Sequence, residues 1–178
     1  MSSTKYTLRK MILSAMFLAL ALVLPFLTGQ IPQIGNKLCP MHIPVILCGF
    51  FCGPFYAVIV GVLSPLLRFS LFGMPILMPT GIAMSFELAA YGLVSALLYK
   101  LLPKRKPYIY VSLICAMLIG RIIWGIASVI ICGIGNSEFG WTAFITGGFI
   151  NAIPGMIIQI ILIPVLVMTL NKYTANNN

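Results

Sequence analysis

The stretch from Met41 to Phe72, MHIPVILCGFFCGPFYAVIVGVLSPLLRFSLF, decides how this chain folds. It contains one charged side chain, Arg68, and it is too long for a single membrane crossing, which needs about 20 apolar residues. Gly53 and Pro54 interrupt it, and proline both lacks a backbone donor and suits the first turn of a helix. We therefore expect a short helix over residues 41–52 and a longer one over residues 54–72.

Four further apolar stretches lie on either side of this one. They predict helices over residues 10–28, 81–101, 108–132 and 143–170, and Pro154 and Pro164 are expected to kink the last of these. Of the 178 residues, 61% are hydrophobic and 7% are charged, whereas roughly 25% are charged in a typical soluble domain. The sequence therefore predicts an all-α integral membrane protein, with a single bundle of six transmembrane helices over residues 1–178.

The scarcity of polar side chains excludes several classes of enzyme. The chain has no aspartate, its two acidic residues are Glu87 and Glu138, and its single histidine is His42. Intramembrane aspartyl proteases and metal-dependent phosphotransferases need several carboxylates, and we expect neither an enzyme nor a metal site. The five cysteines lie mostly in apolar runs and are interpreted as small packing residues.

The basic residues predict the orientation in the membrane. Cytoplasmic loops carry an excess of lysine and arginine, and nucleic acid need not be invoked for the net charge of +9. With a cytoplasmic N-terminus, eight of the eleven basic residues lie on the inner side, namely Lys5, Arg9, Lys10, Lys100, Lys104, Arg105, Lys106 and Lys172. Both termini are therefore expected in the cytoplasm.

Three charged residues fall inside predicted helices, where each costs roughly 2.5–3.5 kcal/mol on insertion scales. Counting about 1.5 Å per residue places Arg68, Glu87 and Arg121 at one level, about 20 Å from the inner face. Asn151 and Gln159 add polar groups at or below that level. One interpretation is a structural Glu–Arg pair with the other arginine directed outward. The other is a polar cavity in the outer half, whose surplus arginine suits a carboxylate.

Other residues have both a structural and a functional interpretation. His42 lies where the first outer loop meets a helix, as either an interfacial residue or a ligand contact, and Tyr91 and Trp124 could line an apolar wall. Ala15 and Ala19 form a small-xxx-small pair that allows a close approach of another helix. That helix could belong to this bundle or to a partner membrane protein.

Four parts of the chain have a pattern typical of a known family: the Ala15–Ala19 pair, residues 40–49 (PMHIPVILCG), residues 52–57 (CGPFYA) with Gly61, and residues 84–92 (MSFELAAYG). In these parts the chain resembles the S components of energy-coupling factor (ECF) transporters. In layout it covers nearly the whole chain. It implies a multi-pass protein of the bacterial cell membrane that binds a vitamin or similar micronutrient in the outer half of its bundle.

The resemblance also implies partners and residue roles. Residues 29–41, with Gln33, Asn36 and Lys37, would form a lid over the ligand, and Ala15 and Ala19 would face a transmembrane coupling protein. Two cytoplasmic ATPase subunits would supply ATP hydrolysis, which agrees with the lack of a phosphate-binding loop motif and of any cofactor site in this chain.

The substrate and the energy source stay open at this level. A surplus positive charge favours a carboxylate-bearing vitamin, pantothenate first and folates next, while riboflavin, thiamine, pyridoxine and biotin remain alternatives. A different class of function is a self-sufficient ion-coupled carrier that uses Glu87 as its proton or sodium site.

Overall fold

The computed structural model describes residues 3–28, 38–103, 105–134 and 141–176. Its elements are α1 (Ser3–Val23), the 3-10 turn η1 (Leu24–Thr28), α3 (His42–Cys52), α4 (Pro54–Phe72), the π-helical turn η2 (Leu77–Gly81), α5 (Ile82–Leu101), α6 (Lys106–Ile134), α7 (Trp141–Ile145), the π-helical turn η3 (Thr146–Ile150) and α8 (Ile153–Asn176). The described residues contain no strand, and the predicted all-α membrane fold is confirmed.

Among the described residues, five helices are long and apolar enough to cross a membrane, and α3 is too short to do so. Its 11 residues extend only about 16 Å, roughly half of a hydrocarbon core. The break expected at Gly53-Pro54 separates α3 from α4, and Gly53 takes a φ of 95° that favours glycine. Non-helical backbone at membrane depth is tolerated where protein covers it, and Cys39 and Met41, just before α3, are buried.

The last predicted helix is divided rather than kinked. The structure replaces one helix over residues 143–170 with α7, η3 and α8, and the division lies between Ile150 and Ile153. Pro154 accounts for it, because a proline in the first turn of α8 cannot donate to a preceding turn. Pro164 lies within α8.

Three helices are longer than the apolar runs that predicted them. α1 begins at Ser3 instead of residue 10, α6 begins at Lys106, and α8 continues to Asn176. Hydropathy detects only the part of a helix that lies in lipid. The basic and polar ends of these helices extend past it.

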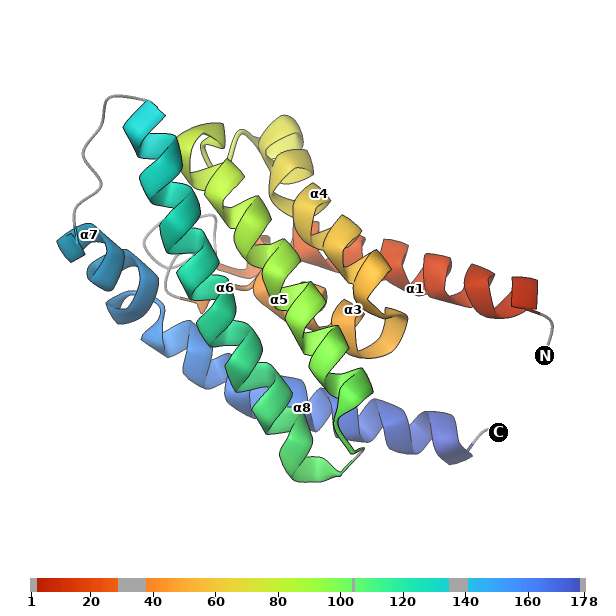
Figure 1. The fold of residues 1–178 in the computed structure, drawn as a ribbon. Coiled ribbons are helices and arrows are strands. Elements are labelled where there is room, and N and C mark those ends of the chain that lie inside the picture. Colours follow the sequence, from red (N-terminus) through yellow and green to blue (C-terminus); the bar gives the residue numbers. More distant parts are fainter. Residues whose placement is uncertain (1–2, 29–37, 104, 135–140, 177–178) are drawn as a thin grey trace.

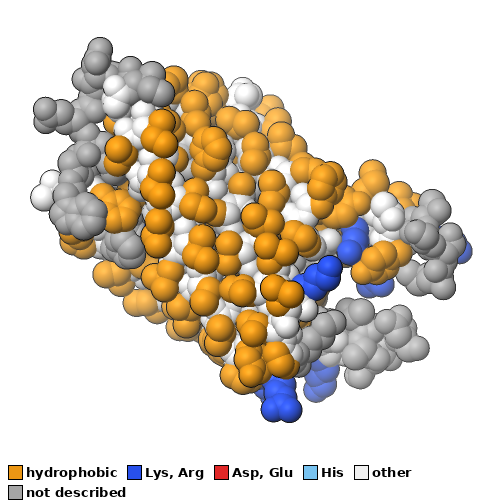
Figure 2. Space-filling model, in the orientation of Figure 1, with side chains coloured by type: hydrophobic (Ala, Val, Ile, Leu, Met, Phe, Trp, Pro, Cys, Tyr) orange, Lys and Arg blue, Asp and Glu red, His pale blue; other side chains and the backbone are white. Residues whose placement is uncertain are grey.

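The two termini lie at the same end of the bundle, as Figure 1 shows. The turn between α5 and α6 lies at that end too, and the lysines and arginines visible in Figure 2 gather there while hydrophobic side chains cover the rest of the face. This arrangement accords with the prediction that both termini face the cytoplasm.

Helix α5 forms the centre of the bundle and packs against α3, α4 and α6 (Figure 1). Glycines allow these contacts to be close. A Cβ on Gly61 of α4 would lie 2.7 Å from the backbone of Leu88 and Ala89, and one on Gly92 of α5 would lie 2.9 Å from Ala57. Helices α4 and α5 are therefore held backbone against backbone.

We expect Gly61→Ala to lower the free energy of unfolding by about 1–3 kcal/mol, since the added methyl group meets backbone atoms that cannot rotate away. Thermal unfolding of the detergent-purified protein measures the effect. Gly133→Ala is the matched control, because nothing lies within 4 Å of a Cβ there. Equal melting temperatures for the two variants would contradict this account of the α4–α5 contact.

Candidate functional site

An ion pair between α5 and α6 lies at the centre of the candidate site. Arg121 Nη1 lies 2.8 Å from Glu87 Oε1, and both side chains are almost completely buried. His42 Nε2, at the start of α3, lies 3.4 Å from the same carboxylate oxygen. Glu87 therefore joins three helices, and it is the arginine of α6 that compensates its charge.

Three more residues complete what we call the polar cluster, which consists of Cys39, His42, Glu87, Tyr91, Arg121 and Gln159. Tyr91 follows Glu87 by one turn on α5, and its ring meets the His42 ring edge to face at 5.1 Å. Gly120 of α6 makes room for that ring, since a Cβ there would lie 3.1 Å from it. Gln159 brings α8 to the cluster, because its Nε2 donates to the carbonyl oxygen of Cys39 over 3.4 Å.

Cys39 connects the chain before α3 to the cluster. Arg121 Nη2 donates to the Cys39 thiol at 3.6 Å, and Cys39 has a φ of 47°, which is uncommon for a residue with a side chain. Burial raises the pKa of this thiol, with the nearby Arg121 acting in the opposite direction. The thiol is therefore protonated and uncharged near neutral pH.

The polar cluster has hydrogen-bonding capacity that the described residues do not use. Buried atoms without a hydrogen-bond partner among them include His42 Nδ1, Tyr91 Oη, Arg121 Nε and Gln159 Oε1. A buried polar atom left unpaired costs about 1–3 kcal/mol, and native proteins contain few of them. Several such atoms in one cluster mark a place that could hold a polar solute.

Arg68 does not lie in the polar cluster, although it was predicted at the same depth. Its Nη1 donates to the carbonyl oxygen of Leu22 at 2.7 Å, and its guanidinium lies 5.1 Å and 5.5 Å from the rings of Phe26 and Phe72. It thus ties the C-terminal ends of α4 and α1 together. Counting residues along a helix gives depth, but which way a side chain points depends on rotation about the axis.

Trp124 and Asn151 do not belong to the polar cluster: Trp124 lies against the α7–η3 segment, and Asn151 lies between η3 and α8. The Trp124 ring stacks on Phe144 of α7, with ring centroids 6.4 Å apart, and Gly147 of η3 lies against it. Asn151 is half-buried between η3 and α8, where its backbone N–H donates to Thr146. The structure therefore assigns Trp124 to the contact between α6 and the α7–η3 segment.

The remaining predicted residues fall into two groups. Ala15 and Ala19 are exposed on the outer face of α1, so the alternative of packing inside the bundle does not hold for them. The predicted lid residues Gln33, Asn36 and Lys37 lie outside the described residues.

Sequence reasoning missed the role of Cys39, which it treated as a packing cysteine, and it gave Gln159 little weight. The signal available for Cys39 was its position three residues before His42. Nothing in the sequence indicated that its carbonyl would meet α8.

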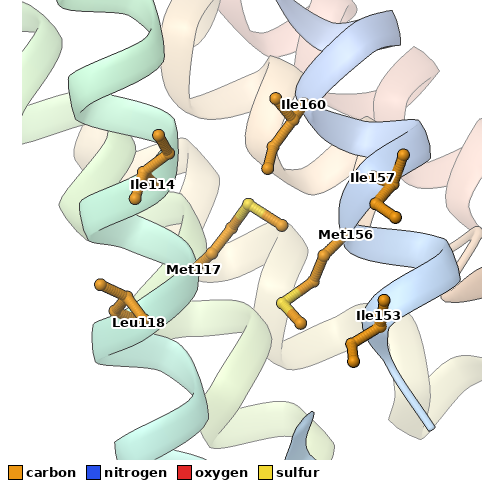
Figure 3. Close-up of a pocket in the computed structure, with 7 residues that line it drawn as sticks. All are labelled: Ile114, Met117, Leu118, Ile153, Met156, Ile157 and Ile160. Atoms are coloured by element: carbon orange, nitrogen blue, oxygen red, sulfur yellow. The ribbon is translucent and has the colours of Figure 1, made fainter. Parts of the chain in front are cut away.

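A groove between α6 and α8 offers a contrasting surface (Figure 3). It has a volume of about 290 Å³ and is lined by Ile114, Met117, Leu118, Ile153, Met156, Ile157 and Ile160. An entirely apolar lining suits lipid chains and offers a polar solute no hydrogen bonds. The groove is therefore not the candidate solute site.

Comparison with known proteins identifies the family. The chain matches neither a curated protein nor a solved structure. The model of the ECF transporter substrate-specific component matches residues 9–167, which is most of the chain and includes every residue of the polar cluster. This multi-pass protein of the cell membrane belongs to the family of substrate-specific components of ECF transporters.

Proposed function

We propose that this chain captures a vitamin-like micronutrient at the polar cluster and delivers it for ATP-driven uptake. Membership of the family supports the general role of a transport subunit. The observation that carries the proposed site is the group of buried polar atoms around the Glu87–Arg121 ion pair that have no hydrogen-bond partner among the described residues. Four helices converge there, and a solute bound among them would be enclosed by the bundle.

Energy for uptake would come from partner subunits. The proposed partners are a transmembrane coupling protein and two cytoplasmic ATPases, and ATP is bound by the ATPases and not by this chain. Exposed Ala15 and Ala19 support a docking face on α1, because small side chains let a partner helix approach closely. Residues 29–41 would cover the bound solute, and Cys39 would link that cover to Arg121.

The geometry of the site does not support the expected preference for a carboxylate-bearing solute. Pantothenate was favoured because a surplus arginine would share a cavity with the Glu–Arg pair. Arg68 instead hydrogen-bonds to Leu22 and packs between two aromatic rings. The proposal therefore keeps a vitamin-like solute and leaves pantothenate without special support.

Uptake into proteoliposomes that contain the coupling protein and the ATPases tests the energy source. We expect uptake to require ATP and to disappear when either partner is omitted, whereas collapse of the membrane potential should leave it unchanged. A mixture of labelled water-soluble vitamins serves as the probe. Uptake by this chain alone that stops when the potential collapses would instead establish the ion-coupled carrier, with Glu87 as its ion site.

A further inference from the structure

The charges of the polar cluster balance one another. Glu87 and Arg121 form an ion pair at 2.8 Å, and Tyr91, Gln159 and the protonated thiol of Cys39 carry no charge near neutral pH. Counted with His42 uncharged, as in the net charge of the chain, the polar cluster has a formal charge of zero. The other arginine within the spanning helices, Arg68, makes its hydrogen bond to α1.

This balance restricts what can bind. An anionic solute that reached Arg121 would also meet the carboxylate of Glu87, and it would leave an uncompensated negative charge within an apolar bundle. A cation would meet Arg121 in the same way. We propose that the polar cluster selects a solute without net charge, an inference that rests on the proposed function of the cluster as the solute site.

The polar atoms that lack a hydrogen-bond partner among the described residues restrict the chemical class of the solute further. Arg121 Nε can only donate a hydrogen bond and Gln159 Oε1 can only accept one, while His42 Nδ1 and Tyr91 Oη can each do either. A complementary solute offers at least one acceptor and one donor. An uncharged amide group, in a chain or at the edge of a ring, carries both side by side. The expected solute is therefore polar, uncharged and amide-like.

Matched pairs of probes test this selection. Protein in lipid nanodiscs at pH 8 would first be equilibrated with a low-mass cell extract, and the retained compounds would be identified by mass spectrometry. Titrations would then compare acids with uncharged counterparts: nicotinate with nicotinamide, pantothenate with panthenol, biotin with its amide, and any retained compound with its own counterpart. We expect the uncharged member of the pair that binds to bind at least about tenfold more tightly, because like charges in contact cost several kcal/mol.

Two variants test whether the polar cluster is the part of the protein that selects uncharged solutes. Glu87→Gln removes the negative charge at nearly constant volume, and it should shift the affinity ratio at least about tenfold toward the acid. Arg68→Gln is the matched control, since it removes a buried charge outside the polar cluster and should leave the ratio unchanged. The wild-type ratio needs no variant, so it decides the question even where Glu87→Gln does not fold.

The outcomes separate the two proposals. Tighter binding of the acid by the wild-type protein would overturn the selection of uncharged solutes and leave the proposed function standing. An equal shift in both variants would overturn the assignment of selection to the cluster. Retention of no compound from the extract or the panel would count against the proposed function and, with it, against this inference.

Discussion

Arg121→Met is expected to reduce the free energy of unfolding by about 3–5 kcal/mol, the range found when one partner of a buried ion pair is removed. The reason is the carboxylate that remains. Glu87 is 1% exposed, and Arg121 is the one arginine or lysine within ion-pair distance of it among the described residues. Methionine fills a similar volume, so that most of the loss arises from charge and little from a cavity.

The double variant Glu87→Gln/Arg121→Met should recover most of that stability, because it leaves no unpaired charge in the bundle. Denaturation in detergent of the wild-type protein, Glu87→Gln, Arg121→Met and the double variant gives the coupling energy. Arg68→Met is a matched control, since Arg68 has a carbonyl oxygen and aromatic rings as neighbours and leaves no buried acid behind. A smaller loss, about 1–3 kcal/mol, is expected for it.

Solute binding by the double variant separates structure from function. We expect a stable protein that no longer binds, since both of the charged groups proposed to contact the solute have changed. A stable double variant with undiminished binding would mean that the pair only holds α5 and α6 together. That result would remove the polar cluster as the solute site. A double variant as unstable as Arg121→Met would show that the ion pair is not the source of the loss.

Sequence reasoning identified the helices well where lipid and proline determine them. The run from Met41 to Phe72 was divided at Gly53-Pro54 because proline cannot continue a hydrogen-bonded turn, and the structure has its boundary there. The same argument should have predicted a helix boundary at Pro154. There a kink was expected, whereas the chain leaves the helix for two residues before α8 begins.

The candidate site was predictable only in part. The cost of burying charge singled out Glu87 and Arg121, and the depth estimate placed both at one level, where the structure pairs them. The same estimate included Arg68, because counting residues cannot show that α4 turns this side chain toward α1. The contacts of Cys39 with other helices could not be predicted, for a different reason. Its contacts with α6 and α8 span more than eighty residues of sequence, and no local pattern records them.

Exposed alanines on α1 lead to the second large expected effect, which is loss of assembly without loss of solute binding. Ala15 and Ala19 lie on the outer face of α1, one turn apart, away from the buried side chains Phe17 and Ala21 that pack into the bundle. Introducing tryptophan at either alanine should keep a partner helix from approaching closely. The fold should be unaffected, because each new side chain points out of the bundle.

Co-purification with the coupling protein measures this effect, and titration with the solute monitors the site. We expect Ala15→Trp and Ala19→Trp to reduce recovery of the coupling protein by at least about tenfold, which corresponds to about 1.4 kcal/mol, while the affinity for solute stays unchanged. Val129→Trp is the matched control, since Val129 is exposed on α6, away from α1. Loss of assembly in all three variants would indicate a general effect of bulk on the lipid face. Normal assembly of both alanine variants would show that the coupling protein docks on another helix. It would not bear on the proposed solute site, because none of the residues of the polar cluster lies on α1.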